Sequence, residues 1–368
     1  MRWTSFSTIR FAAAFICALC CSPATAQQSA PANSITPPSS IAAAPPSSRL
    51  INLDVVVTSQ SGQVTPGLQQ QDFIVLDDNR PLNVGAFHAA ESSPSAADPP
   101  AEVVLVLDEV NTSYRHMTIA RQEVEKFLSQ YSGPLPWPIS IVFFSDKGTS
   151  GTTPSRDAKK VIADLKANPA PLPNANRAQG IYGAVDRYNL SLRTVGQLAD
   201  FEAKHPGRKL VIWIGPGWLF LANSRVDLSI KDQQNLFRTI VSLSDSLRNA
   251  RITLYNVDPA GSGSVRRDYY KSFVKPVTAA KQIKGGELAL QVLAEQSGGL
   301  VLNSTNDLAA EIATCAADAN SFYTFSFDGA VGDGPDDYHA LAVKVNKPGF
   351  NTRTRAGYYA QPGSAAAR

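Results

Sequence analysis

The sequence lacks the short motifs that mark several large classes of enzyme. It has no G-x-S-x-G turn for a nucleophilic serine, no H-E-x-x-H pair for zinc and no G-x-x-x-x-G-K-[ST] loop for phosphate. Its four histidines are scattered along the chain and show no spacing typical of metal ligands. These absences argue against the familiar hydrolases and nucleotide-dependent enzymes.

Cysteine and long apolar segments are also scarce. Three of the four cysteines, Cys17, Cys20 and Cys21, stand near the start of the chain, and Cys315 follows alone in a helical pattern of apolar residues. We expect Cys315 to be a buried hydrophobic side chain rather than a reactive thiol. No run of about 18 apolar residues occurs, so we expect no integral membrane protein.

The first 26 residues have the pattern of a secretion signal. Arg2 and Arg10 are basic, residues 11–20 are apolar, and Ala24-Thr25-Ala26 is a small-residue cleavage site. We therefore expect a secreted or periplasmic protein without an intramolecular disulfide, because only Cys315 remains after cleavage. Loss of the two arginines leaves a nearly neutral chain, which offers no electrostatic attraction for nucleic acid or an anionic membrane.

Changes in composition divide the rest of the chain into parts. Residues 27–48 are rich in Ala, Pro and Ser, and we expect a disordered tether there and a disordered tail at 361–368. Alternating residues predict strands in 49–90 and 320–360, which we expect to pair into one small β module. Residues 101–319 would then form an α/β domain inserted between its two halves.

The α/β part begins with five aliphatic residues, Val103 to Leu107, which is typical of a strand buried on both faces. Further apolar runs at 139–144, 210–214 and 252–257 alternate with helical patterns. The predicted fold class is α/β, with a doubly wound, mainly parallel sheet. Because ligands bind outside the carboxyl ends of such strands, Asp108 marks the candidate site.

The chain carries, in order, the segments LDVVVTSQSGQVTPGLQQQDFIVLDDNRP, VVLVLDEVNTSY, HPGRKLVIWIGPG, ITLYNVDPAG, LAEQSGGLVLN and HALAVKVNKPGFNTRTRAGYYA. In these segments it resembles the VWFA-related family of secreted acidobacterial proteins, and its central part resembles a von Willebrand factor type A domain. The resemblance covers roughly residues 50–360. It implies a fold rather than a function, because the family's biochemical role is not established.

The type A resemblance implies a place for a divalent cation, held by a D-x-S-x-S loop, a Thr from a second loop and an Asp from a third. Asp108 and Thr112 match the ends of the first loop, but Val110 replaces its first Ser. The second loop, around 171–180, has no Thr, and the third reads Gly215-Pro216-Gly217 where Thr-Asp-Gly is expected. The resemblance thus implies at most a weak Mg²⁺ or Ca²⁺ site at Asp108 and Thr112, and no cofactor is certain.

Exposed aromatic residues beside a rigid sheet edge are typical of protein-binding surfaces. We expect Trp218 to be partly exposed near Asp108, with Tyr114 close by. The favoured function is a non-enzymatic, adhesion-type module that binds another protein or a cell-envelope polymer. The predicted binding rim consists of Glu109, Asn111, Tyr114, Gly215, Gly217, Trp218 and Asp258.

The residues after the first strand allow other interpretations. In the simplest, Asp108 accepts hydrogen bonds from its own turn, and Asn111 or Thr112 caps the following helix. In a second, Asp108 and Thr112 hold a cation through which a partner's carboxylate binds. In a third, Asp108, Ser113 and His116 converge in an envelope hydrolase, although no residue is assigned a catalytic role.

Overall fold

The computed structural model describes residues 50–91, 101–170, 180–218, 228–263, 268–332 and 334–361. The chain divides into two units, Met1–Ser34 and Ile35–Arg368, and every described residue belongs to the second. The expected secretion signal, the tether at 27–48 and the tail after residue 361 lie outside the described residues.

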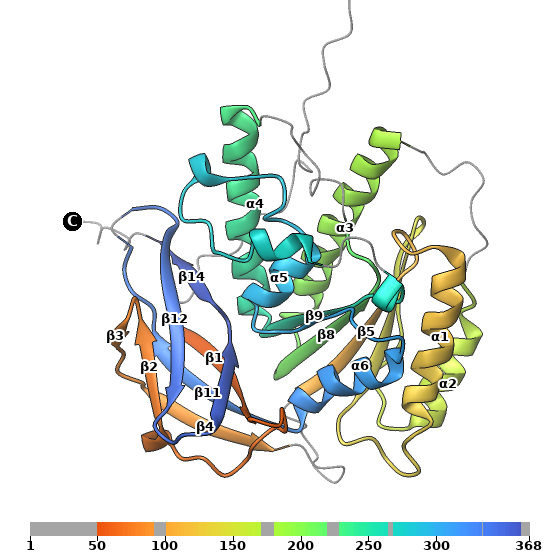
Figure 1. Ribbon diagram of the computed structural model, residues 1–368, viewed down its shortest axis with the longest axis horizontal. Helices are drawn as coiled ribbons and strands as arrows, with labels where there is room; N and C mark the ends of the chain where they lie inside the picture. Colours follow the sequence, from red (N-terminus) through yellow and green to blue (C-terminus); the bar gives the residue numbers. More distant parts are fainter. Residues whose placement is uncertain are drawn as a thin grey trace, which may run out of the picture. The chain divides into compact units, whose positions relative to one another are not determined.

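A six-stranded sheet with the strand order β10-β9-β8-β5-β6-β7 forms the α/β part (Figure 1). Its strands run parallel except for β7, which is antiparallel to β6. They are β5 (Ala101–Asp108), β6 (Ile139–Ser145), β7 (Gly148–Gly151), β8 (Arg208–Ile214), β9 (Ile252–Val257) and β10 (Val301–Leu302). The predicted apolar runs form β5, β6, β8 and β9, which confirms a mixed α/β fold with a mainly parallel sheet.

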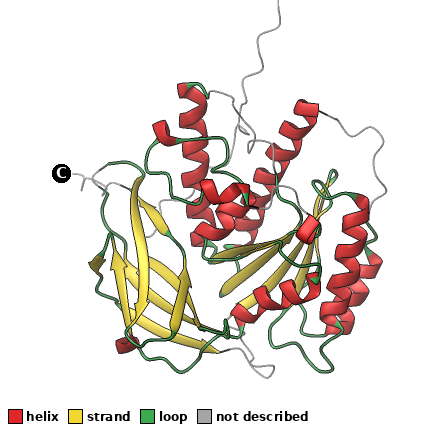
Figure 2. Cartoon of the chain, in the orientation of Figure 1, coloured by secondary structure: helices red, strands yellow, loops and turns green. Residues whose placement is uncertain are grey.

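Helices pack on both faces of this sheet, as the red helices around the yellow strands in Figure 2 show. Val103, Leu105 and Leu107 of β5 pack with α1, α2 and α6, whereas Val104 and Val106 pack with α3, α4 and α5. The helices are α1 (Tyr114–Leu128), α2 (Ala158–Ala167), α3 (Gly180–Glu202), α4 (Ile230–Asn249), α5 (Leu290–Gln296) and α6 (Leu308–Ala316). Because successive side chains of a strand point to opposite faces, the unbroken apolar run of β5 serves both cores.

Two expectations about the helices can be compared with the structure. Cys315 in α6 is a free, fully buried cysteine, and burial raises the pKa of its thiol well above the usual range. Among the described residues, no helix combines the length and apolar character needed to cross a membrane.

The described chain also contains five short 3₁₀ helices: η1 (Gln70–Asp72), η2 (Gly261–Gly263), η3 (Tyr269–Ser272), η4 (Ala280–Gln282) and η5 (Ala317–Ala319).

Strands from before and after the α/β part form two further four-stranded sheets, ordered β13-β1-β11-β4 and β14-β12-β2-β3. Val55, Phe73, Phe325 and Val343 belong to the apolar core that these sheets share. The strands are β1 (Leu50–Ser59), β2 (Phe73–Asp77), β3 (Arg80–Pro81), β4 (Ala86–Glu91), β11 (Ser321–Asp328), β12 (Asp337–Val345), β13 (Phe350–Thr354) and β14 (Gly357–Ala360).

Charged side chains connect these strands to the α/β part. Arg251, between α4 and β9, donates to Asp54 of β1 at 2.5 Å and to Thr324 of β11 at 3.1 Å. Arg353 of β13 makes a two-pronged contact with Asp318 at 2.7 and 2.9 Å. Because each charged group is paired where it is shielded from water, these contacts fix the strands without leaving an isolated buried charge.

Candidate functional site

The candidate site lies at the carboxyl edge of the sheet, which we define by Asp108, Ile214 and Val257, the last residues of β5, β8 and β9. Asp108 is completely buried at this edge. Its Oδ1 accepts hydrogen bonds from the backbone N–H groups of Val110, at 3.1 Å, and Asn111, at 2.8 Å. The interpretation of Asp108 as an acceptor for its own turn is therefore confirmed.

Side chains also donate to this carboxylate. Trp213 Nε1 and Asn111 Nδ2 each lie 2.9 Å from Asp108 Oδ2, and Asn111 Nδ2 is 2.9 Å from Ser191 Oγ in α3. Burial raises the pKa of Asp108, while the hydrogen bonds from Trp213 and Asn111 act in the opposite direction. The carboxylate is thus enclosed by N–H donors from β8 and its own turn.

The donors around Asp108 do not suit a metal. Mg²⁺ and Ca²⁺ bind oxygen ligands, whereas both oxygens of Asp108 face N–H groups that a cation would have to displace. Thr112 Oγ1 is buried without a hydrogen-bond partner among the described residues, but one hydroxyl oxygen is far fewer ligands than a divalent cation needs. Asp258 is also buried, and its Oδ1 accepts from the backbone of Ala260 at 2.9 Å, within its own turn. These residues do not fit a divalent cation.

Glycine allows the loop after β8 to approach Asp108. A Cβ atom on Gly215 would lie 2.7 Å from Asp108 Cβ and 3.2 Å from Thr112 Oγ1, which leaves no space for a larger residue. Gly217 has a φ of +71°, and a Cβ there would lie 2.8 Å from Gln291 Nε2. The two glycines of the predicted rim therefore serve close packing of the edge rather than an exposed surface.

The expected exposure of Trp218 in the rim and the expected cap of the following helix are both wrong. Trp218 is only 3% exposed, because its ring packs edge-on against Trp213 and its Nε1 donates to Leu288 O at 2.5 Å. The cap of α1 is Ser113, whose Oγ accepts from His116 N at 3.3 Å, and not Asn111 or Thr112. The side chain of Asn111 is instead bound to Asp108.

The residues of the hydrolase interpretation do not converge. Among the described residues, Asp108 makes no hydrogen bond to Ser113 or His116, and its oxygens are occupied by other donors. The Ser113 hydroxyl caps α1, as a residue at that position usually does. A nucleophile needs a neighbouring base that is itself oriented, and this arrangement supplies none.

Glu109, the residue directly after β5, is a second titratable group of this edge. Burial raises its pKa from 4.5 to about 7, the charge of Arg121 lowers it, and the charge of Asp108 raises it. Glu109 Oε1 lies 3.4 Å from Arg121 Nη1, and the same guanidinium donates to Leu165 O at 2.6 Å. The pair joins the turn after β5 to α1 and α2.

Large apolar side chains are exposed beyond the carboxyl edge. Tyr114, Tyr182 and Ile230 are 47%, 71% and 75% exposed and lie in the first turns of α1, α3 and α4. In α3, Ser191 contacts the edge through Asn111, so Tyr182, nine residues earlier, lies about 13 Å beyond it. Figure 1 shows the ends of α3 and α4 extending past the strands.

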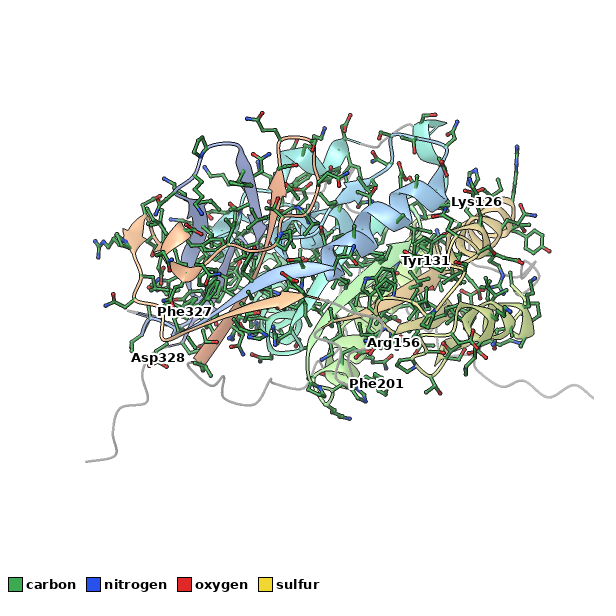
Figure 3. All side chains as sticks on the ribbon, turned by 90° about the horizontal axis from the view of Figure 1, so that it is seen from below. Lys126, Tyr131, Arg156, Phe201, Phe327 and Asp328 are labelled. Carbon is green, nitrogen blue, oxygen red and sulfur yellow. The ribbon has the colours of Figure 1, made fainter. Side chains whose placement is uncertain are left out.

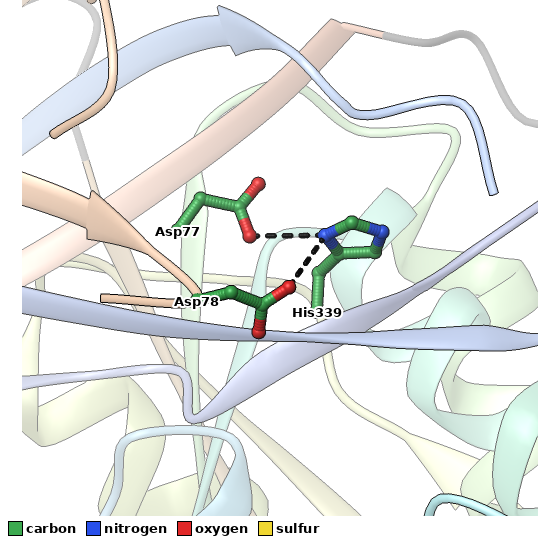
Figure 4. A group of neighbouring side chains, drawn as sticks. All are labelled: Asp77, Asp78 and His339. Carbon is green, nitrogen blue, oxygen red and sulfur yellow. Dashed lines mark hydrogen bonds and ion pairs between the residues drawn. The ribbon is translucent and has the colours of Figure 1, made fainter. Parts of the chain in front are cut away.

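A second group of titratable side chains lies away from this edge (Figure 4). His339 Nδ1 is 3.0 Å from Asp77 Oδ1 and 3.1 Å from Asp78 Oδ2. Tyr358 donates to the other oxygen of Asp77 at 2.8 Å and stacks on the imidazole ring. Sequence reasoning missed this group because the histidine stands far from the two aspartates along the chain. Its contacts tie the β2–β3 turn to β12 and β14.

Comparisons with known proteins give distant similarities. No family model and no curated protein matches the chain. An aerotolerance-related membrane protein from Bacteroides fragilis NCTC 9343 is similar at 11% identity and a TM-score of 0.30, over 59% of this chain and 97% of that one. The SpRpn10 VWA domain is similar at 12% identity and a TM-score of 0.28, over 57% and 93%.

A longer similarity involves the pilus adhesin SpaC from Lactobacillus rhamnosus GG in an open conformation. It has 9% identity and a TM-score of 0.37, and it covers 80% of this chain and 49% of SpaC. At such identities no functional residue is transferred from any of these proteins to the present chain.

Proposed function

We propose that the chain is a secreted, non-enzymatic module of von Willebrand factor A type that binds another protein through the carboxyl edge of its sheet. The sequence pattern supports the family and the secretion signal. The observation that carries the proposal is the group of exposed apolar residues on the projecting helix ends, Tyr114, Tyr182 and Ile230. Exposed Tyr side chains are typical anchors of protein interfaces, and exposed apolar residues beside them mark interaction sites.

The structure of the edge supports a binding surface that does not need a metal. Asp108 is satisfied by N–H donors, and Gly215 closes the space beside it. Contacts with a partner would therefore come from the exposed residues above this rigid base. Among the described residues, no nucleophile and oriented base meet there, which favours binding over catalysis.

Site-specific crosslinking tests this proposal. A photoreactive amino acid at position 182 or 230 is expected to form an adduct with one partner protein from the organism's envelope, in the presence of EDTA. The same amino acid at Leu50, which is 52% exposed on β1, is the matched control and is expected to give no such adduct.

Affinity measurements with the purified partner complete the test. Tyr182→Ala and Ile230→Ser are expected to raise the dissociation constant by about tenfold each, as anchors of an interface do, whereas Leu50→Ser leaves it unchanged. Equal adducts from position 50 would count against this surface. Adducts that disappear in EDTA would favour metal-dependent binding instead.

A further inference from the structure

A cavity of about 760 Å³ lies at the opposite end of the sheet, between the last turns of α3 and the β6–β7 hairpin. Glu102 and Ser140, the second residues of β5 and β6, form its floor together with Glu202, the last residue of α3. We call this end the amino edge, defined by Ala101 and Arg208, the first residues of β5 and β8. Cavities of this size commonly hold small organic ligands.

The cavity contains a buried carboxylate without a hydrogen bond. Glu202 is only 4% exposed, and among the described residues its side-chain oxygens have no hydrogen-bond partner. The imidazole of His205 is 3.8 Å away, an ion-pair contact when the ring is protonated but too far for a hydrogen bond. A buried carboxylate that accepts no hydrogen bond is costly even beside a cation, because its oxygens are normally met by N–H or O–H donors. A group that supplies them from within the cavity would remove that cost.

A second carboxylate stands in the same cavity. Glu102 accepts one hydrogen bond, from Ser140 Oγ at 2.8 Å. Burial raises the pKa of both glutamates, and the charge of Glu102 raises that of Glu202 further. Lys209 is the nearby cation, but it is buried and its Nζ donates to the backbone oxygen of His205. With both glutamates ionised, the floor therefore keeps an excess of negative charge.

The rest of the lining is partly apolar and partly hydroxylic. Phe201 is 57% exposed and lies at the outside of the molecule (Figure 3), with Leu198 and Val142 beside the same cavity. Thr152 and Thr194 add hydroxyl groups to the wall. An acidic floor below apolar walls suits a ligand with a positive charge on a short aliphatic stem, and an aromatic face attracts such a cation as well.

We propose that this cavity binds a small primary alkylamine, whose ammonium group pairs with Glu202 and Glu102 while its aliphatic stem packs against Phe201 and Leu198. The ammonium supplies three N–H donors, whereas Glu202 accepts no hydrogen bond from the described residues. This site lies at the end of the sheet opposite the proposed partner-binding surface and does not depend on it.

The proposal is tested by calorimetric titration with putrescine. The protein used is the chain expressed without residues 1–26. Saturable binding is expected for putrescine and none for 1,4-butanediol, which has the same length without charge. Glu202→Gln is expected to weaken binding at least about tenfold, because a hydrogen-bonded charge pair is lost. Phe201→Ala is expected to weaken it several-fold through loss of apolar contact.

The matched control is Asp200→Asn, which removes an exposed carboxylate from the same helix outside the cavity. It is expected to leave the affinity for putrescine unchanged. Equal loss of affinity in Asp200→Asn and Glu202→Gln would show non-specific attraction and overturn the proposal, as would equal binding of butanediol. Tighter binding of N-acetyl-lysine methylamide than of putrescine would keep the ammonium pairing but overturn a free alkylamine as the occupant, and would assign the cavity to a lysine side chain of a partner.

Discussion

The two ends of the central sheet each hold a buried carboxylate, and the two carboxylates differ in the hydrogen bonds that they accept. At the carboxyl edge, Asp108 accepts hydrogen bonds from Trp213, Asn111 and the backbone of its own turn. At the amino edge, Glu202 is 4% exposed and has an ion-pair contact with His205 but no hydrogen bond among the described residues, and it lines a cavity.

This difference separates a structural carboxylate from a candidate binding group. Asp108 matches the first position of the D-x-S-x-S loop, yet N–H donors already occupy its oxygens. The residue therefore holds the carboxyl edge together. No motif draws attention to Glu202, yet its carboxylate accepts no hydrogen bond among the described residues, which is costly in the absence of a ligand. The number of donors around a buried acid is therefore more informative than its position in a family pattern.

The largest effect is expected from Asp108→Asn. The amide places an N–H group against donors from Trp213, Asn111 or the backbone, so at least one hydrogen bond is lost. We expect the free energy of unfolding to fall by about 3 kcal/mol, since hydrogen bonds to charged groups contribute about 1.5–3 kcal/mol each. Urea denaturation at pH 7 measures this, with the exposed Asp200→Asn as control. Equal stability of both variants would contradict the structural role of Asp108.

The next effect concerns pH and Glu109. Its pKa is raised by burial from 4.5 to about 7, so the folded chain holds a proton that the unfolded chain releases between these values. This contribution to stability is fully present below pH 4.5 and is lost as pH rises towards 7, on the order of 3 kcal/mol. We expect Glu109→Gln to flatten this part of the stability profile, measured by denaturation at intervals between pH 4 and 8. An unchanged slope would show that Glu109 titrates normally.

The strands were the part of the fold that the sequence predicted best. The five consecutive aliphatic residues from Val103 to Leu107 predicted a buried strand. In the structure they belong to the two apolar cores on opposite faces of the sheet. Helix ends are harder to predict: the first buried residue of α4 is Leu236, but the helix begins at Ile230, because its exposed first turn is capped by Ser229, whose Oγ accepts from the N–H of Asp232. Apolar periodicity does not detect such a turn, although the cap itself is a sequence signal.

The candidate site could be predicted only in part. The position of Asp108 and its bonds to its own turn are local and could be inferred from adjacent residues. The burial of Trp218 depends on Leu288, and the cavity brings Glu102 and Glu202 together from distant segments. Such contacts arise from tertiary packing, which no local pattern specifies.

A smaller loss of stability is expected from Gly215→Ala. The new Cβ would stand 2.7 Å from Asp108 Cβ, so the loop after β8 has to shift, at a cost of about 1–3 kcal/mol. Gly196→Ala in α3 is the matched control, because a Cβ there meets nothing within 4 Å. We expect that control to raise stability by about 0.5–1 kcal/mol. Thermal melts of both variants show whether the edge is as closely packed as the structure indicates.

Glu202→Gln is expected to act in the opposite direction from Asp108→Asn. Burial and the charge of Glu102 raise the pKa of Glu202, so its ionisation weakens the folded state as pH rises above the usual value for glutamate. The amide removes that penalty, and we expect stability to increase by about 1 kcal/mol at pH 8. At pH 4 both chains carry a neutral group, and the difference should vanish. A loss of stability at pH 8 would mean that the charges of Lys209 and His205 outweigh the cost of burying Glu202.

The smallest effect is expected from divalent cations. A ligand at a hundred times its dissociation constant adds about 2.7 kcal/mol to the free energy of unfolding, which a thermal melt detects readily. Since N–H donors occupy both oxygens of Asp108, we expect no change of melting temperature when millimolar Mg²⁺, Ca²⁺ or Mn²⁺ is added after EDTA treatment. An increase that is absent in Asp108→Asn would show that a cation displaces Trp213 and Asn111. The edge would then be a metal site that rearranges on binding, and partners with free carboxylates would be the ones to seek.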